Sequence, residues 1–441
     1  MTESLPASFT RNLRRATEAA RRLKLWSGKL FQDVLPKLDL AAGATRRIAI
    51  IGAGLSGLCA GYLLAEAGLE VTVLEARKQP GGRTLTLRDA FFPDGIHADA
   101  GAARISDVHA RTLAWIRHFG LALDPMYPEA GHLIGERDGH PVLGADAARL
   151  SAHDIHHILT SHLHWDAQRA ASRSARVLAR NSFVKPNWYR IRDGMDSLAR
   201  AFADRLPGAI RYGAPVTAIR QDATGVGIRF RTSGGDQWLR ADFVVSAVPY
   251  TTLKAIEVSP PFPDDKRRII DRSRCESATR VFLQLRDRAW LPPHWSGFGV
   301  TGNRWEIWHS SFASTQRCVL AVYAQGEAAV PFAALTGAAR IARVKEHLEK
   351  LFPGILASCE SAAEICWDEN PWSLGAQQVG ELPHDLVTRV EGRVHFAGAH
   401  TSETGWMEGA LESGYRVAAE ILPKAQDSTW HNAVAPEGLR L

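Results

Sequence analysis

The segment 47–51 is almost continuously apolar and β-branched, which is typical of a strand buried on both faces of a parallel sheet. A glycine-rich stretch (52–57) follows at once, and a helical run (58–67) comes next. A second apolar strand (71–74) ends at the acid Glu75. This order of strand, turn, helix and strand predicts a βαβ unit whose two strands lie parallel.

The rest of the chain alternates between strand and helix patterns. Strands are predicted at 209–211, 215–220, 225–231, 237–239, 242–249, 280–285, 318–324 and 394–398, with Gly234-Gly235 as a hairpin turn. Helices are predicted over 194–206 and 340–351, and again from residue 406, where glycine and alanine are frequent. The stretch 106–190 carries few strand signals, and we expect it to be helical.

Together these elements predict an α/β fold in which a dinucleotide-binding domain carries an inserted α+β substrate domain and a helical subdomain. The predicted boundaries are 1–45 for a basic N-terminal extension, 46–105, 191–260 and 371–425 for the dinucleotide-binding domain, 106–190 for the helical subdomain, 261–370 for the substrate-binding domain and 426–441 for a tail. A length of 441 residues is consistent with two or three domains.

The stretch 52–57 matches the G-x-G-x-x-G fingerprint in its full context of strand, helix, strand and acid. Gly52 allows the tight turn, Gly54 lets the backbone approach a pyrophosphate, and Gly57 lets the helix lie close to the sheet. Glu75 can accept hydrogen bonds from the two ribose hydroxyls, which disfavours a 2′-phosphate and hence NADP. No second fingerprint occurs, so reduction by NAD(P)H is not expected.

The net charge of +6 comes almost entirely from the first 30 residues, which hold seven Lys and Arg against two Glu. The remaining body is nearly neutral, so a nucleic-acid role for it has no electrostatic support. Apolar residues in the basic segment recur at helical spacing, which favours a helix packed on the body and leaves a membrane-surface or partner helix as the alternative. No run of about 18 apolar residues occurs, so we expect no membrane span.

Cysteine and histidine usage adds two expectations. The five cysteines form no C-x-x-C motif, and their odd number indicates a reducing, cytoplasmic environment without a disulfide framework. His153, His156 and His157 share one helical face near His162 and His164. We interpret this cluster as a solvated or lid surface and predict no metal site.

Two further segments carry a family resemblance. Gln79-Pro80-Gly81-Gly82-Arg83-Thr84 follows the acidic strand end, where two glycines and an arginine can wrap a pyrophosphate a second time. Near the C-terminus, Phe396-Ala397-Gly398-Ala399-His400 is followed by Gly405-Trp406 and a glycine-rich helix. In motif order and spacing, residues 46–425 resemble the flavin amine oxidase superfamily. The resemblance implies an FAD cofactor, bound non-covalently because Ala376 stands where monoamine oxidases carry the attachment cysteine.

Within that superfamily the chain is most similar to the L-amino-acid oxidases. Ala98 to Ile105 resembles the segment in which those enzymes place the arginine that binds the substrate carboxylate, which assigns that role to Arg104. The alternative for Arg104 is a flavin-phosphate or structural ion-pair arginine. The resemblance also implies that Tyr323 supports the carboxylate, that Trp406 forms one wall of the substrate slot, and that the Gly405 carbonyl accepts a hydrogen bond from the substrate amine.

The implied reaction is hydride transfer from Cα of an L-amino acid to flavin N5, which yields a 2-oxo acid, ammonia and hydrogen peroxide with O₂ as acceptor. Trp188, Trp305, Trp308 and Trp372 favour a bulky or aromatic substrate. Three alternatives stay open: an amine oxidase without carboxylate recognition, a decarboxylating amino-acid monooxygenase, and a flavin-bearing binding or regulatory protein. We expect a homodimer.

This chain departs from the family pattern at three positions. Arg280 stands where the superfamily often has a lysine that holds a water near flavin N5, and arginine is a fixed fork rather than a point charge. Ala399 replaces the usual acid, which removes a ribityl contact. Gln377 replaces an aromatic residue, so a two-sided aromatic cage is not assured. Arg280, at the lysine position, and Trp406, at the aromatic position beside the flavin, are the candidate catalytic residues that the resemblance implies.

The cofactor-binding set that follows from the motifs and the resemblance is spread along the whole chain. It comprises Gly52, Gly54, Leu55, Ser56, Gly57, Glu75, Ala76, Arg77, Gly82, Arg83, Gly101, Ala102, Ala103, Arg104, Val216, Val248, Trp372, Gly398, Ala399, Gly405, Trp406, Met407 and Ala410.

Overall fold

The computed structural model describes residues 46–88, 96–161, 186–287, 291, 293–310, 317–380 and 382–426. The predicted basic helix of the N-terminal extension, the histidines His162 and His164, and the tail beyond residue 426 lie outside the described residues. No helix within the described ranges is both long enough and apolar enough to cross a membrane.

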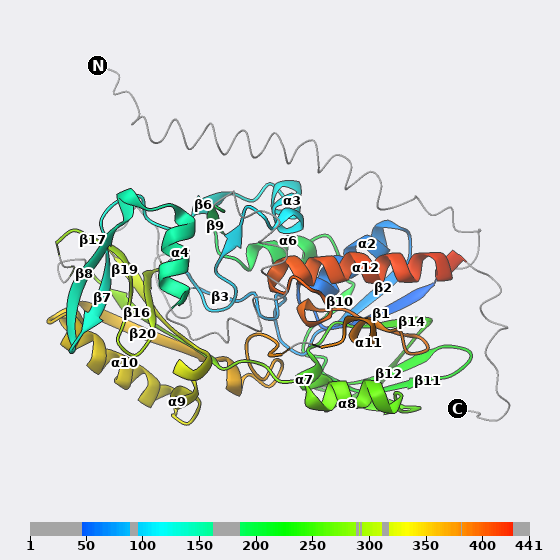
Figure 1. The fold of residues 1–441 in the computed structure, drawn as a ribbon. Coiled ribbons are helices and arrows are strands. Elements are labelled where there is room, and N and C mark those ends of the chain that lie inside the picture. The colour runs from blue at the N-terminus through cyan, green and yellow to red at the C-terminus, as the bar shows by residue number, and fades with distance from the viewer. Residues whose placement is uncertain are drawn as a thin grey trace, which may run out of the picture.

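A parallel sheet of five strands forms the centre of the first body (Figure 1). Every neighbouring pair in it is parallel, as the apolar, β-branched sequences of its strands predict. Its strands, in spatial order, are β10 (Ile210–Arg211), β2 (Glu70–Leu74), β1 (Arg47–Ile51), β14 (Phe243–Ser246) and β21 (Val394–Phe396).

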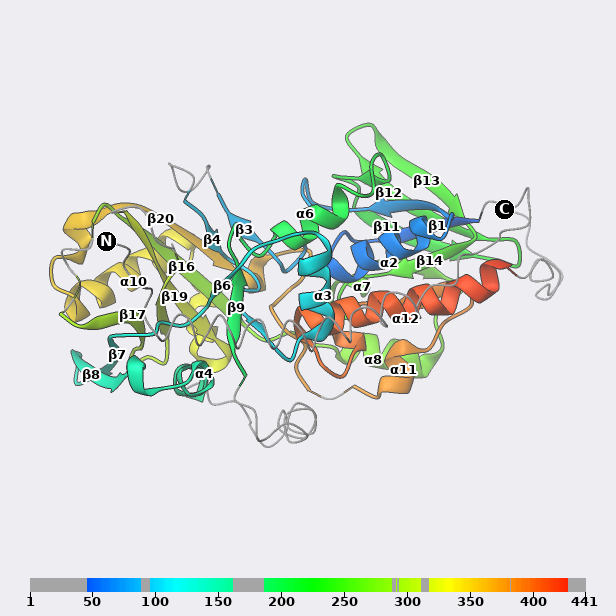
Figure 2. The same ribbon diagram turned by 90° about the horizontal axis from the view of Figure 1, so that it is seen from above.

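Two helices from opposite ends of the chain lie side by side on this sheet, α2 (Leu55–Glu66) and α12 (Trp406–Gln426) (Figures 1 and 2). A Cβ atom on Gly414 would lie 2.8 Å from Cys59 Cβ and 2.9 Å from the Ser56 carbonyl oxygen. Only glycine therefore allows α12 to approach α2 this closely. The contact brings the predicted cofactor motifs of both chain ends into one layer.

A second sheet flanks the parallel one, with β12 and β13 joined by the predicted Gly234-Gly235 hairpin. Its strands are β13 (Gly235–Ala241), β12 (Val226–Thr232), β11 (Val216–Gln221) and β15 (Glu257–Ser259). The remaining helices of this body are α6 (Ser197–Ala203), α7 (Tyr250–Leu253), α8 (Asp264–Arg272) and α11 (His384–Thr388). Two short sheets are also present. One pairs β3 (Thr86–Leu87) with β4 (Ala98–Asp99), and the other has the strand order β5 (Ile105–Ser106), β9 (Trp188–Ile191) and β6 (Leu123–Pro125).

The second body is a sheet of seven strands that is antiparallel except between β17 and β7 (Figure 2). Its strands, in spatial order, are β20 (Cys359–Cys366), β16 (Ala278–Leu285), β19 (Cys318–Gln325), β18 (Glu306–His309), β17 (Trp295–Val300), β7 (His132–Arg137) and β8 (His140–Asp146). Helix α10 (Gly337–Leu351) packs on β16 and β20 through Val344, Leu348 and Leu351. Other elements of the described residues are the short α9 (Val330–Ala333) and the 3₁₀ turns Ala147–Arg149, Gly326–Ala328, Ile355–Ser358, Trp367–Glu369 and Ala399–Thr401.

The stretch 106–190 differs from the helical subdomain that we expect from the sequence. In its described part, α3 (Ala110–His118) and α4 (Ala152–Ser161) are accompanied by strands β6 to β9. The β7–β8 hairpin turns at Asp138 (φ 53°) and Gly139 (φ 79°), two consecutive left-handed residues that are typical of a type I′ turn. This Asp-Gly signal is present in the sequence, but the polar strands beside it lack a clear apolar alternation.

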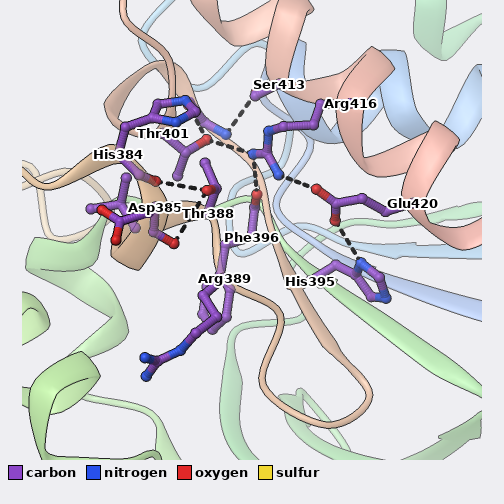
Figure 3. A network of polar contacts seen from close by, with 12 residues as sticks. His384, Asp385, Thr388, Arg389, His395, Phe396, Thr401, Ser413, Arg416 and Glu420 are labelled. Atoms are coloured by element: carbon purple, nitrogen blue, oxygen red, sulfur yellow. Dashed lines mark hydrogen bonds and ion pairs between the residues drawn. The ribbon is translucent and has the colours of Figure 1, made fainter.

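Side chains of α12 hold the end of β21 and the turn that follows it (Figure 3). Ser413 Oγ accepts a hydrogen bond of 2.8 Å from the Gly398 amide, and Arg416 donates to the Phe396 carbonyl (2.6 Å) and to Thr401 Oγ1 (3.0 Å). Glu420 accepts from Arg416 and from the ring of His395, which is fully buried in β21. This network fixes the position of the Gly398 turn relative to α12.

We predict that Glu420→Gln destabilises the protein by about 1–3 kcal/mol at neutral pH, because it leaves buried partners unsatisfied. Burial raises the pKa of Glu420, but the hydrogen bond to His395 and the Arg416 charge outweigh it and hold the pKa below its usual value. A depressed pKa stabilises the fold above the unfolded pKa, and this contribution is lost as the pH falls. The wild-type advantage should therefore be full above about pH 4.3 and shrink below it.

Thermal unfolding followed across this pH range checks the prediction. The matched control is Glu346→Gln on α10, which removes an exposed ion pair with Lys350 and should hardly change the melting temperature. If Glu420→Gln has no larger effect than Glu346→Gln, the network does not stabilise the fold.

Candidate active site

A cavity of about 1040 Å³ extends from the carboxyl ends of the parallel strands to the seven-stranded sheet. The turns after β1, β2, β14 and β21 contribute Gly52, Glu75, Ala247 and Gly398 to its wall. Strands β16 and β19 contribute Arg280 and Tyr323 at the other end. Ligands of open α/β sheets bind at this edge, so the fold places a binding site where the sequence motifs converge.

Every predicted cofactor residue except Gly57 lines this one cavity. Gly57 faces the sheet, because a Cβ atom there would lie 2.1 Å from the Gly52 carbonyl oxygen and 3.1 Å from Ala247 Cβ. Gly54 has no heavy atom within 4 Å of an added Cβ, so the space in front of it is open. These environments agree with the packing role predicted for Gly57 and with the close ligand approach predicted for Gly54.

The buried carboxylate of Glu75 is oriented by its own loop. Its oxygens accept hydrogen bonds from the backbone amides of Ala53 (2.6 Å) and Arg77 (2.8 Å). Burial raises the pKa of Glu75, and the two amides act in the opposite direction. Each carboxylate oxygen keeps a second lone pair, so ribose hydroxyls can still donate to it.

The second glycine loop stands against the first. The Gly81 amide donates to the Ala53 carbonyl (2.8 Å), and Arg77 Nη1 donates to the Gly82 carbonyl (2.7 Å). Arg83 Nη1 donates to the Ala376 carbonyl (2.7 Å), which joins this loop to a distant part of the cavity wall. Backbone amides and arginines therefore surround the space where a pyrophosphate would lie.

His400 is a cavity residue that the sequence analysis does not select. It is 8% exposed, and neither ring nitrogen has a hydrogen-bond partner among the described residues. Burial, together with the positive charges of Arg83, Lys266 and Arg416, lowers the pKa of His400 to about 3, so the ring is neutral. One sequence signal could have identified His400: it directly follows Ala399, which stands in place of the acid usual in the family.

Two buried arginines, Arg104 and Arg280, line the inner end of the cavity. Arg104 donates to both carboxylate oxygens of Glu306, which is 0% exposed. Burial lowers the pKa of Arg104, but Glu306 outweighs burial and raises it above its usual value. The structure thus contains the ion pair that the sequence analysis weighs as an alternative for Arg104, and its carboxylate-binding role stays a prediction.

Arg280 approaches the same place from the sheet and is 6% exposed. Its Nη1 donates to the carbonyls of Asp99 (2.6 Å) and Gly101, and its Nε has no partner among the described residues. Its guanidinium carbon lies 4.3 Å from the ring centroid of Tyr323 and 5.3 Å from that of Trp308. Burial lowers the pKa of Arg280, which remains a cation at neutral pH.

Tyr323 lies between Arg280 and Glu306 in the sheet, because it is paired in register with Arg280 on one side and Glu306 on the other. Burial raises the pKa of Tyr323 to about 12, so its hydroxyl keeps its proton. Residues in one cross-strand row point to the same face. A cation, a phenol and a carboxylate therefore stand side by side on the sheet.

Trp406 begins α12 with a left-handed backbone (φ 56°) and is 38% exposed on the cavity wall. Its ring lies 6.0 Å from that of Trp188 and 5.7 Å from that of His109. Strain of this kind often marks functional positions. The Gly405 carbonyl accepts a 2.5 Å hydrogen bond from the Gly409 amide, so its predicted bond to a substrate amine would use the second lone pair.

The other aromatic candidates divide into two groups. Trp372 lines the cavity together with Trp367, whose Nε1 donates to the Ala100 carbonyl at 3.0 Å. Trp188, Trp305 and Trp308 are not among the lining residues. Trp188 contacts Trp406, Trp308 lies under the Arg104 guanidinium, and Trp305 packs against Phe332 and His347.

The histidine cluster of α4 does not form a uniformly solvated surface. The ring of His156 stacks on Trp188 with centroids 3.8 Å apart, and its Nδ1 lies 2.7 Å from the Tyr127 hydroxyl. Burial and the nearby Arg104 charge lower the pKa of His156 to about 2. Within the described residues no group of three His, Cys, Asp or Glu side chains could hold a metal ion.

The fold and this cavity define a dinucleotide-binding enzyme with a buried, charged substrate end. The chain matches the family described as "Flavin containing amine oxidoreductase" over residues 55–153 and 142–422. The chain therefore belongs to the flavin-containing amine oxidoreductases, and the predicted resemblance is confirmed.

Curated relatives with similar sequences are amino-acid oxidases by name. Flavin-dependent L-tryptophan oxidase RebO of Lentzea aerocolonigenes is 26% identical over 473 residues, which cover 85% of this chain and 98% of that protein. L-amino-acid oxidase of Mus musculus is 25% identical over 465 residues, or 89% of this chain and 73% of that protein. Cyclohexylamine oxidase from Brevibacterium oxydans IH-35A has a similar fold, with a TM-score of 0.72 and 20% identity over 87% of this chain and all of that structure.

We predict that Gly54→Ala and Gly57→Ala weaken FAD binding for different reasons. The Gly54 methyl meets no protein atom, so the apoprotein should keep its melting temperature while FAD affinity falls about 10-fold or more, roughly 1.4 kcal/mol. The Gly57 methyl collides with the Gly52 carbonyl, so the apoprotein itself should melt earlier. FAD titration and thermal unfolding of the apoprotein check both effects. Equal melting temperatures for the two variants would contradict the packing role of Gly57.

Proposed function

We propose that this protein is an FAD-dependent L-amino-acid oxidase with non-covalently bound FAD. The reaction converts an L-amino acid, water and O₂ into a 2-oxo acid, ammonia and hydrogen peroxide. The observation on which the proposal rests is the pair of buried arginines that line the inner end of the cavity: Arg104 is paired with Glu306, and Arg280 has no ion-pair partner among the described residues. A buried guanidinium without an anionic partner suits a substrate that carries a carboxylate.

When bound, a flavin would supply the oxidising power for removal of the substrate Cα hydride. The protein's own residues bind and orient the substrate. The arginine end takes the carboxylate, Tyr323 remains a proton donor beside it, and Trp406 provides an apolar wall for the side chain. Trp367 and Trp372 extend the aromatic lining, which supports a bulky or aromatic side chain.

Support for non-covalent FAD comes from the cavity wall. Ala376 lines it and offers no nucleophile, and none of the five cysteines, all within the described ranges, reaches the lining. Residues around the predicted pyrophosphate position supply amides and arginine side chains instead. The homodimer and the cytoplasmic location stay predictions.

Anaerobic addition of L-amino acids should bleach the flavin absorbance of the holoenzyme, whereas amines with the same side chains should bleach it far more slowly. The physical reason is that an amine leaves the excess positive charge uncompensated. Stopped-flow spectroscopy with paired amino acids and amines measures both rates. Bleaching by amines and not by amino acids would contradict the proposal.

The second candidate function is amine oxidation. Two observations favour it: cyclohexylamine oxidase has a similar fold, and Arg104 is already neutralised by Glu306. A decarboxylating monooxygenase would also use the arginine end. Quantifying the 2-oxo acid against the amide product under air separates the oxidase from the monooxygenase, and the proposal expects the 2-oxo acid.

A further inference from the structure

The resemblance to the L-amino-acid oxidases assigns the substrate carboxylate to Arg104, but the buried charges favour its neighbour. Arg104 already has a carboxylate partner, because two of its nitrogens donate to the two oxygens of Glu306. A substrate carboxylate at Arg104 would lie next to that of Glu306, and like charges in a buried site repel each other strongly. Arg104 is therefore a neutralised group.

Arg280 has no such partner. It lines the cavity, and its Nη1 donates to two backbone carbonyls, which carry no net charge. The Nε atoms of both arginines are buried and unpartnered, but only Arg104 has an ion pair, and no carboxylate within the described residues forms one with Arg280. A guanidinium in this state has donor capacity left for a planar anion.

The strand register explains why Glu306 does not form ion pairs with both arginines. Arg280 on β16 and Glu306 on β18 are separated by Tyr323 on β19, so two strand spacings, roughly 10 Å of sheet, lie between them. Arg104 reaches Glu306 from the other body and occupies both of its oxygens.

Other acids near Arg280 are also engaged. Asp99 accepts from Thr86 Oγ1 (2.6 Å) and from the Met195 amide (2.9 Å). Glu276, just before β16, accepts from Gln325 Nε2 (2.7 Å). Asp99 and Glu306 act on Arg280 only through space, so its guanidinium has no direct carboxylate partner among the described residues and can still pair with a ligand.

We propose that Arg280, and not Arg104, anchors the α-carboxylate of the substrate, and that Glu306 causes this assignment by neutralising Arg104. The inference rests on the proposed amino-acid oxidase function and names the recognition group within the same site. Tyr323, whose ring faces the Arg280 guanidinium, fixes the plane of that fork.

The test uses FAD-loaded variants and the ratio of kcat/KM for L-phenylalanine to kcat/KM for phenethylamine, which differ by the carboxylate. Arg280→Gln should lower this ratio about 30-fold or more, because the KM for the amino acid rises by a larger factor than that for the amine. Arg280→Lys keeps the charge but loses the planar fork, and it should retain part of the preference.

The matched control removes the neutral pair as a unit, in the double variant Arg104→Gln with Glu306→Gln, so that neither charge is left buried alone. Its absolute rates can change, but its amino-acid preference should stay within about 3-fold of wild type. A double variant that loses the preference, while Arg280→Gln keeps it, overturns the inference and returns the carboxylate to Arg104.

Two further measurements cover a variant that does not fold and a failure of the proposed function. If Arg280→Gln does not fold, Arg280→Lys and a flavin-absorbance titration with phenylacetate decide the question, because wild type should bind this carboxylate more tightly than the variant does. An equal affinity overturns the inference. A wild-type enzyme that prefers phenethylamine contradicts the proposed function itself, whatever the variants do.

Discussion

Two buried guanidinium groups lie at the inner end of the cavity, but Glu306 is paired with Arg104 and not with Arg280, and the rest of the site depends on this imbalance. Moving an ion out of water costs several kcal/mol even after the protein relaxes. Glu306 offsets that cost for Arg104. Among the described residues, Arg280 contacts carbonyl oxygens and the rings of Tyr323 and Trp308 instead of a carboxylate. Charged hydrogen bonds of about 1.5–3 kcal/mol and cation–π contacts of about 0.5–2 kcal/mol offset only part of the cost. A substrate carboxylate would complete the balance.

The elements around the predicted cofactor motifs line the same cavity as the two arginines and fix its shape. Helices α2 and α12 approach closely at Gly414, and the α12 network of Ser413, Arg416 and Glu420 fixes the turn at Gly398. Glu408 lies in the first turn of α12 and accepts two hydrogen bonds of 2.9 Å, from the amide and the hydroxyl of Thr112 near the start of α3. The first turn of α12, and with it Trp406, is thereby held on the wall of the cavity that the glycine turns and the two arginines also line.

Sequence motifs predict more of the residues that line the cofactor end of the cavity than of those at its arginine end. Motifs such as Gly52 to Gly57 act through local backbone geometry, so spacing alone locates them, and the strands of the parallel sheet follow from their apolar runs. Glu306 could not be found in this way. It pairs with a residue 202 positions away, and only the register of β18 beside β19 brings it to Arg104. The β7–β8 hairpin was also missed, although its Asp138-Gly139 turn is visible in the sequence.

Binding of a matched pair of ligands that the enzyme cannot oxidise tests the central claim most directly. Phenylacetate and its primary amide have the same shape, but only the first carries a charge. The account predicts that the holoenzyme, titrated through its flavin absorbance, binds the carboxylate at least about 10-fold more tightly, roughly 1.4 kcal/mol. Equal affinities, or tighter binding of the amide, would show that no uncompensated positive charge awaits a ligand at Arg280.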